Sequence, residues 1–382
     1  MNDKLARRRL ALLAPLGWMA ARAAVAAEPG VRPRDVLIGQ TISLKGGANA
    51  YGVEVQAGIH TLLEDVNRAG GVHGRKIVLQ TLDDNDQTDR ADANARILLD
   101  SGVFMLFGSI EGGPSTAVMR VAVERGVPFF GPMAGSPELR RPHQPLVYPV
   151  RAEHRDEFRA LVRHGLSIGR KRVGLFHADS ATGRLHLDSV RLVAAESGAE
   201  VVLASAFKPD IDDAQLDELV RQIAQKQVEV MLNHGSAALY ARLIRKAAMV
   251  GLRTRFFAVN SGSTQLAASL GPLAHGMVFS QVMPSPWSTK TGIAREYQAA
   301  FQRAKPDHEL SYGSLEGYAT AKALAAALHL AGANLNRAGL ARALESNVVD
   351  LGGIKLSYQP GRHVGSSLVD LAMVTREGKF LQ

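Results

Sequence analysis

Short runs of β-branched and apolar residues alternate with segments of helical periodicity along most of the chain. The first pair is a strand over 35–42 and a helix over 53–68, whose apolar residues recur at helical spacing. The same pattern predicts strands over 76–82, 103–107, 127–130, 172–177, 200–206, 228–232 and 256–259, and helices over 89–100, 115–125, 184–197, 213–226 and 237–250. Strands that alternate with helices indicate βαβ units and a mainly parallel sheet.

The alternation runs in two consecutive series, separated by a proline-containing connection at 145–149. From residue 283 the pattern turns helical, with helices expected over 292–303, 314–331 and 337–345, followed by strands over 353–357 and 367–374. A chain of 382 residues with 46% hydrophobic and 21% charged residues can bury two ordinary cores. We therefore expect a globular α/β protein of two lobes.

The first 27 residues have the order of a secretory signal peptide. Basic residues at Lys4 and 7–9 precede an apolar stretch over 10–21 and small residues over 25–27. The apolar run is shorter than the ~20 residues that a membrane-spanning helix needs. We expect export to the periplasm, by the general secretory rather than the twin-arginine route, without insertion into the membrane. The mature chain is expected to begin near Glu28.

Charge and cysteine content exclude several classes of function. The formal charge of +9 is spread along the chain, and part of it belongs to the signal segment, so no basic stripe predicts a nucleic-acid partner. Cysteine is absent, which excludes disulfides, thiolate metal sites and cysteine nucleophiles and suits an oxidising compartment.

Catalytic and cofactor motifs are missing from the sequence. The dinucleotide, phosphate-loop, nucleophile-elbow and zinc-protease patterns are all absent. The 12 histidines show no metal-ligand spacing, so we expect them on the surface or in loops, with no metal site. The acidic segment 83–86 can be read either as a cation site or as a solvated loop that caps a helix. We expect a protein without catalytic activity or cofactor.

Glycine and hydroxyl residues follow two of the predicted strands. Segments 108–116 and 131–137 leave buried strands, and the first enters a helix. Such loops either form tight turns with helix caps or bind an anion at the free N–H groups of a helix N-terminus.

Several segments resemble the type I periplasmic binding proteins for leucine, isoleucine, valine and related amides. The most specific is Asn67-Arg68-Ala69-Gly70-Gly71-Val72-His73-Gly74-Arg75, in which the glycines can end a helix and turn into a strand. The other matching segments are Tyr51-Gly52, Val127-Pro128, 179–183, Gly251-Leu252 and 318–328, within a match that runs from about Val36 to Gly361.

The resemblance implies two Rossmann-like lobes joined by three crossing segments near Val150, Val282 and Gly352, with a ligand trapped by hinge closure. The implied division is a signal peptide at 1–27, a first lobe from 28–150 plus 283–352, and a second lobe from 151–282 plus 353–382. The implied function is capture of a small solute and its delivery to an inner-membrane ABC permease and its ATPase, by a protein expected to be a monomer. A periplasmic sensor module that feeds a signalling receptor is the alternative.

The ligand site is carried over position by position. Tyr51 matches the family's loop tyrosine, the carboxylate-binding serine falls on Gly112 or Gly113 with Ser115 nearby, and the ammonium-binding loop holds Met133, Gly135 and Ser136. In the second lobe, two tyrosines become Thr182 and Ser236, and the acid that neutralises the ammonium becomes Asn260.

Asn260 changes what the site can bind, because an amide does not neutralise a buried cation. The substitution predicts a carboxylic acid, keto acid or amide rather than an ordinary amino acid as the ligand. Glu111 is the candidate to supply the missing negative charge.

Overall fold

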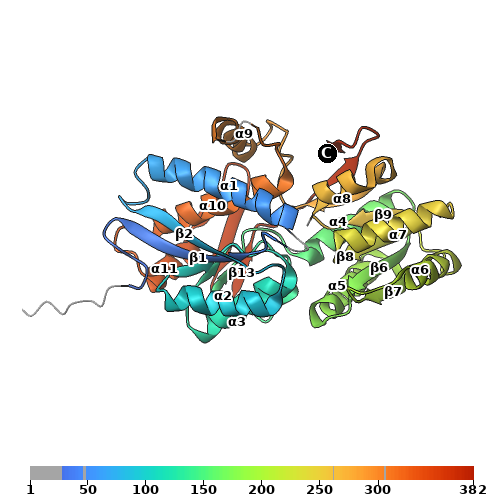
Figure 1. Ribbon diagram of the computed structural model, residues 1–382, viewed down its shortest axis with the longest axis horizontal. Coiled ribbons are helices and arrows are strands. Elements are labelled where there is room, and N and C mark those ends of the chain that lie inside the picture. The colour runs from blue at the N-terminus through green and yellow to red at the C-terminus, as the bar shows by residue number, and fades with distance from the viewer. Residues whose placement is uncertain (1–27, 46–48, 261, 305–306) are drawn as a thin grey trace, which may run out of the picture.

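The computed structural model describes residues 28–45, 49–260, 262–304 and 307–382, and the expected signal peptide lies outside them. The chain forms two α/β lobes that lie side by side along the long axis of the molecule (Figure 1). Among the described residues, no helix is both long and apolar enough to cross a membrane.

The first lobe has a five-stranded parallel sheet in the order β2-β1-β3-β4-β5. Its strands are β1 (Asp35–Ile42), β2 (Lys76–Asp83), β3 (Met105–Phe107), β4 (Phe129–Phe130) and β5 (Val147–Tyr148). Its helices are α1 (Asn49–Arg68), α2 (Thr88–Asp100), α3 (Gly112–Glu124), η1 (Pro137–Leu139), α9 (Gly292–Ala304), α10 (Tyr312–Ala331) and α11 (Arg337–Ser346). Separate apolar clusters pack α1 with α9 to α11 and α2 with α3, so the sheet lies between two helical layers.

The second lobe has a seven-stranded sheet in the order β15-β14-β10-β9-β8-β6-β7, with β14 and β15 antiparallel to their neighbours. Its strands are β6 (Arg172–Ala178), β7 (Glu200–Phe207), β8 (Val230–His234), β9 (Arg255–Ala258), β10 (Val278–Gln281), β14 (Asp370–Val374) and β15 (Phe380–Leu381). Its helices are α4 (His154–Ser167), α5 (Ala181–Ser197), α6 (Asp213–Gln225), α7 (Ala237–Met249), α8 (Ser263–Leu270) and η2 (Gly271–Ala274).

A small antiparallel sheet corrects the expected last crossing. It contains β11 (Val348–Asp350), β12 (Lys355–Gln359) and β13 (Arg362–Gly365). Leu356 and Tyr358 of β12 pack in the apolar cluster of α1 and α10, and the Tyr358 hydroxyl donates to the carbonyl of Pro149 at 2.9 Å. The chain therefore joins the second sheet only between β13 and β14, not near Gly352, because the apolar face of β12 belongs to the first lobe.

Local sequence explains most of the elements. Seven of the eight residues of β1 are buried, as expected for a parallel strand covered on both faces. Gly70 and Gly71, at the end of α1, adopt φ of 103° and 74°, so they supply the left-handed turn that the resemblance predicted. Reciprocal side-chain and backbone bonds between Ser311 and Ser314 form a capping box at the start of α10.

Close packing of α1 on α10 depends on glycine. A Cβ added at Gly58 would lie 1.9 Å from the Ser314 carbonyl oxygen, and one added at Gly317 would lie 2.1 Å from the Val55 carbonyl oxygen. The two backbones approach closely because neither position carries a side chain. This approach places Tyr51 of α1 against Glu316 of α10.

The strand and helix pairs predicted from periodicity are confirmed to within a few residues at most ends. The apolar pattern does not predict helix α4. Its buried side chains include His154 and Glu157 among the apolar Phe158, Leu161 and Val162. These buried polar residues weaken the apolar pattern that would mark the helix.

Candidate ligand site

Two adjoining cavities lie between the lobes, with volumes of ≈ 20 Å³ and ≈ 300 Å³. They share Glu111, Gly235 and Ala237 as lining residues. The smaller is also lined by Gly112, Ala134, His154, Asn233, His234, Ala258, Val259 and Leu266, and the larger by Ala50, Tyr51, Asp86, Ser236, Ala238, Gly262 and Gln265. These residues follow the carboxyl ends of parallel strands or begin helices, which is where open α/β sheets bind ligands.

Two helix N-termini face this cleft. Helix α3 begins at Gly112, and α7 begins at Ala237 after Ser236, whose hydroxyl caps the helix by accepting from the N–H of Leu239. The first N–H groups of a helix have no intrahelical acceptor, and the helix dipole makes this end partly positive. The cleft therefore offers backbone donors from both lobes to an anionic group.

Glu111 precedes α3 with an unusual backbone conformation. Its φ of 61° and ψ of 151° lie in a region that residues other than glycine rarely adopt, at a cost of about 1–3 kcal/mol. Burial raises the pKa of its carboxyl to about 7, and the neighbouring Asp86 contributes in the same direction. Among the described residues that line the two cavities there are two carboxylates, Glu111 and Asp86, and no lysine or arginine.

Several of the residues expected at the site lie around this cleft. A Cβ added at Gly112 would lie 2.6 Å from the Ser136 Oγ and 3.4 Å from the Thr182 Cγ2. The carbonyl of Gly135 accepts a hydrogen bond from the N–H of His154 at 2.9 Å. Tyr51 and Ser236 line the larger cavity.

Three other expected residues face the first lobe. The Ser115 hydroxyl lies 2.7 Å from that of Ser109 and donates to the carbonyl of Ile110 at 3.2 Å. Met133 is buried in the apolar core, and a Cβ added at Gly113 would meet the Thr88 hydroxyl at 2.7 Å. We propose ligand contacts for Tyr51, Gly112 and Ser236, which line the cavities, and supporting positions for Gly135, Ser136, Thr182 and Asn260, rather than any such role for Ser115, Met133 and Gly113.

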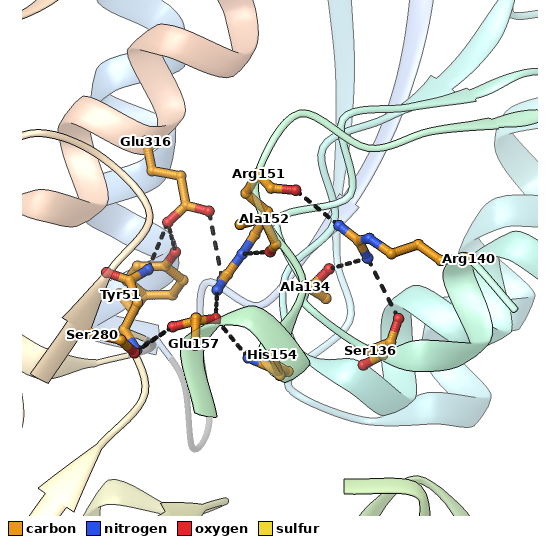
Figure 2. A network of polar contacts seen from close by, with 11 residues as sticks. Tyr51, Ala134, Ser136, Arg140, Arg151, Ala152, His154, Glu157, Ser280 and Glu316 are labelled. Atoms are coloured by element: carbon orange, nitrogen blue, oxygen red, sulfur yellow. Dashed lines mark hydrogen bonds and ion pairs between the residues drawn. The ribbon is translucent and has the colours of Figure 1, made fainter. Parts of the chain in front are cut away.

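A buried ionic network lies where the lobes meet (Figure 2). Arg151, in the first crossing segment, is 1% exposed and forms an ion pair with Glu157 of α4. Its guanidinium lies 3.7 Å from the carboxylate of Glu316. Burial alone would raise the pKa of Glu157, but Arg151 and His154 lower it to about 2. Burial raises the pKa of Glu316, an effect that Arg151 partly offsets.

Asn260 belongs to this network. Its backbone N–H donates to Glu157 at 3.0 Å, and its side-chain amide donates to Glu316 at 2.9 Å. The Tyr51 hydroxyl donates to the same Glu316 oxygen at 2.6 Å. The amide at position 260 is thus matched by a carboxylate from the opposite lobe, a pairing that the sequence does not predict.

Arg140 fixes the loop after β4 through hydrogen bonds to the loop backbone. Its guanidinium donates to the carbonyls of Ala134 at 3.3 Å and Ser136 at 3.4 Å, and to the carbonyl of Arg151 at 2.9 Å (Figure 2). Burial lowers the pKa of Arg140 to about 10. The same cation therefore positions the cleft loop and the crossing segment.

The expectation that the histidines are surface or loop residues is wrong for several of them. His154, His177, His186 and His363 are buried, since they lie on regular elements whose apolar faces enclose them. His154, His186 and His234 form one cluster beside Phe158. Burial lowers the pKa of all three.

Side-chain hydrogen bonds between described residues join the lobes across the cleft. Thr182 donates to Glu138 at 2.6 Å, Gln265 donates to Glu54 at 2.8 Å, and the Asn260 amide donates to Glu316. These bonds hold the two lobes together around the cavities.

Two similar α/β lobes, three crossings and a polar cleft between them define a bilobal solute-binding protein of the type I periplasmic class. The family model described as periplasmic binding protein matches residues 35–379, so the chain belongs to this family. The chain is 25% identical over 325 residues to the Leu/Ile/Val-binding protein BraC3 of Rhizobium johnstonii, covering 81% of this chain and 83% of that protein.

Solved structures share the fold. A possible leucine/isoleucine/valine-binding protein from Rhodopirellula baltica superposes with a TM-score of 0.83 at 25% identity, covering 94% of this chain and 98% of that one. A fatty acid ABC transporter substrate-binding protein from Thermomonospora curvata gives a TM-score of 0.82 at 20% identity, covering 92% of each chain. Proteins of this fold thus carry names that refer to different solutes, while the family binds solutes and does not catalyse reactions.

Proposed function

We propose that this protein is the exported substrate-binding component of an ABC importer and that it holds a small amino acid between its lobes. The observation that carries the proposal is the pair of helix N-termini, α3 and α7, that face the same cleft beside Glu111. The solute would pass from this cleft to an inner-membrane permease. The similar fold of the fatty acid ABC transporter substrate-binding protein from Thermomonospora curvata supports this role.

The helix N-termini suit the carboxylate of an amino acid. The first-turn N–H groups at Gly112 on one side and at Ala237 on the other are backbone donors at the positive ends of two dipoles. A carboxylate that bridges them gains contacts with both lobes only when the lobes are closed. This arrangement links binding to closure.

The two carboxylates that line the cleft suit the ammonium group of an amino acid. Glu111 borders both cavities and Asp86 borders the larger one, so the cleft has negative charge although position 260 carries an amide. In the family, an acid at the position of Asn260 neutralises the ammonium group of the ligand. We assign this role to Glu111. An ammonium group placed beside Glu111 would stabilise its ionised form and lower its raised pKa. The larger cavity has the volume at the lower end of the range for small-molecule sites.

A thermal-shift screen tests the assignment. The probes are leucine, isoleucine and valine, the 2-oxo acids that correspond to them, and simple aliphatic amides. A ligand at about 100 times its Kd stabilises by roughly 2.7 kcal/mol, which raises the melting temperature of a chain of this size by several degrees. We expect the amino acids to give the largest shift, whereas the expectation drawn from Asn260 alone favours the oxo acids or amides.

Two variants of Glu111 separate charge from folding. Glu111→Gln keeps the size and removes the charge, and Glu111→Gly also removes the backbone strain, so the glycine variant should melt at least as high as the wild type. Both should lose the amino-acid shift. A shift from amino acids that survives in both variants, or a larger shift from the 2-oxo acids in the wild type, overturns the role of Glu111.

Export is proposed from the order of basic, apolar and small residues over 1–27. Intact-mass measurement of the protein released from cells by osmotic shock should give a chain that begins near Glu28. A full-length chain found only in the cytoplasmic fraction contradicts export.

A further inference from the structure

Three histidines from separate elements of the second lobe meet at the base of the cleft. His154 begins α4, His186 lies in α5 and His234 ends β8. One ring nitrogen of each lies within 4.8 Å of those of the other two. The ring centroids of His186 and His234 are 3.6 Å apart, and that of His154 lies 4.5 Å from His234.

His186 lacks the partners that a buried imidazole normally has. Its side chain is 0% exposed, and neither ring nitrogen has a hydrogen-bond partner among the described residues. A neutral imidazole carries one donor and one acceptor, and leaving a buried polar group unpaired costs about 1–3 kcal/mol. Within the described part of the chain, the ring nitrogens of His186 therefore lack a partner, which a bound group could supply.

His154 is oriented by a carboxylate. Its Nδ1 lies 2.8 Å from an oxygen of Glu157, which leaves Nε2 as the nitrogen that is available to another partner (Figure 2). Glu157 is itself fixed by Arg151 and by the Ser280 hydroxyl, which donates to it at 2.7 Å. A carboxylate that holds one imidazole nitrogen while the other binds a metal is a common arrangement around metal sites.

The small cavity provides room beside the cluster. It is lined by His154 and His234 together with Glu111 and Gly112, and its volume of ≈ 20 Å³ fits about one water-sized particle. A ligand to an ion at the histidines, either water or a donor atom of a solute, could occupy this space.

We propose that His154, His186 and His234 bind one divalent late first-row transition-metal ion such as Zn²⁺, Ni²⁺ or Cu²⁺, with a fourth position open to the cleft. Imidazole nitrogen suits these ions, and three protein ligands with one open position are typical of accessible zinc sites. Tetrahedral coordination at about 2.0–2.1 Å places ligand nitrogens roughly 3.4 Å apart, so the rings need only a modest inward movement. The site was not expected from the sequence, because the three histidines lie far apart along the chain.

Metal titration without any organic solute tests this inference independently of the proposed amino-acid site. Tag-free protein is treated with a chelator, and Zn²⁺ is titrated in competition with a chromophoric chelator. Co²⁺ is then used as a spectroscopic probe of tetrahedral coordination. We expect one ion per chain and intense visible absorption of the Co²⁺ form.

The variants are His234→Gln, at a half-buried position, and His186→Asn, with His363→Gln as the matched control. His363 is also buried, but its nitrogens lie near the carbonyl of Val147 and the carboxylate of Glu345. Loss of a direct ligand should weaken Zn²⁺ binding by more than about 100-fold, since loss of an outer partner alone costs 10–100-fold. The control should bind as the wild type does, and melting curves in chelator should show that each variant is folded.

Absence of saturable Zn²⁺ binding by the wild type overturns the proposal. So does equal affinity in wild type and folded His234→Gln, because the ion would then bind elsewhere. Failure of the amino-acid screen together with normal metal binding contradicts the proposed solute and leaves the metal site in place.

Discussion

The positive charge of Arg151 compensates the negative charges of two buried carboxylates. It faces Glu157 and Glu316 in a region where all three side chains are at most 1% exposed. Removing one member of a buried ion pair leaves a charge without compensation, which costs about 3–5 kcal/mol. Arg151→Met should therefore lower the free energy of unfolding by about this amount in denaturant titration.

Two further variants check the electrostatic cause of that loss. Adding Glu157→Gln to Arg151→Met removes one uncompensated charge and should recover part of the stability. Arg125→Met breaks an exposed ion pair with Asp100 and should change the melting temperature little. Equal losses of stability in the Arg151 and Arg125 variants would contradict a special cost of breaking the buried ion pair.

Glu111 makes stability depend on pH. Its pKa is about 7 in the folded chain and 4.5 as the ordinary value, so the folded state binds this proton more tightly than the unfolded state. Its contribution is therefore present below pH 4.5 and is lost as the pH rises to about 7, on the order of 2 kcal/mol for a partly exposed group. Denaturant titrations from pH 4.5 to 8 should show this decline as a difference between wild type and Glu111→Gln. Parallel pH profiles for the two proteins would refute it.

At the scale of elements, the approach of α1 to α10 sets the position of Tyr51 and Glu316. Gly317→Ala places a methyl group 2.1 Å from the Val55 carbonyl oxygen and must push the helices apart. Overpacking of this kind costs typically 1–3 kcal/mol. The variant should melt several degrees lower than the wild type.

Gly339→Ala in α11 is the matched control for this helix contact. Its added Cβ would lie 3.3 Å from the nearest atom, an oxygen of the Asn336 side chain. The better helix propensity of alanine offsets that tighter contact, so the control should stay near the wild-type melting temperature. Equal loss in both variants would mean that helix separation is not the cause.

How much the sequence predicts also differs between elements. Strands β1 and β3 follow from apolar runs bounded by turn residues, because a strand buried on both faces has a simple pattern. Helix α4 does not, since His154 and Glu157 occupy buried positions where the pattern requires apolar residues. Their burial depends on Arg151 and His186, which are contacts between separate elements and leave no local signal in the sequence.

The site shows the same limit. Gly112, Ser136 and Thr182 follow from the resemblance, since each lies at or just before the start of a helix that follows a strand. Glu316 does not, because it lies within a long helix whose other buried residues are mostly small and apolar. Only the close packing of α1 and α10 shows that this carboxylate reaches Asn260.

At the scale of the whole molecule, the lobes are joined by weak bonds suited to reversible opening. Thr182→Ala and Gln265→Ala remove two hydrogen bonds that span the cleft. At about 1 kcal/mol each, their loss should shift the balance toward the open form by roughly 30-fold. Small-angle scattering of the ligand-free double variant should give a larger radius of gyration than the wild type.

Gln80→Ala is the control for lobe opening. It removes a hydrogen bond with Ser101 that lies within the first lobe. Its radius of gyration should equal that of the wild type. A double variant as compact as this control shows that the two bonds do not govern closure.

Calorimetric titration of Ala237→Trp tests whether a small solute is held between the lobes at the ends of α3 and α7. Ala237 lines both cavities, so an indole at this position fills the cleft. Ala248→Trp, at an exposed position near the other end of α7, is the control. With leucine, isoleucine, valine, their 2-oxo acids and aliphatic amides as probes, at least one should bind the wild type and the control with one site per chain and bind Ala237→Trp at least about tenfold more weakly. Equal affinity for wild type and Ala237→Trp would show that the solute does not bind between the ends of α3 and α7.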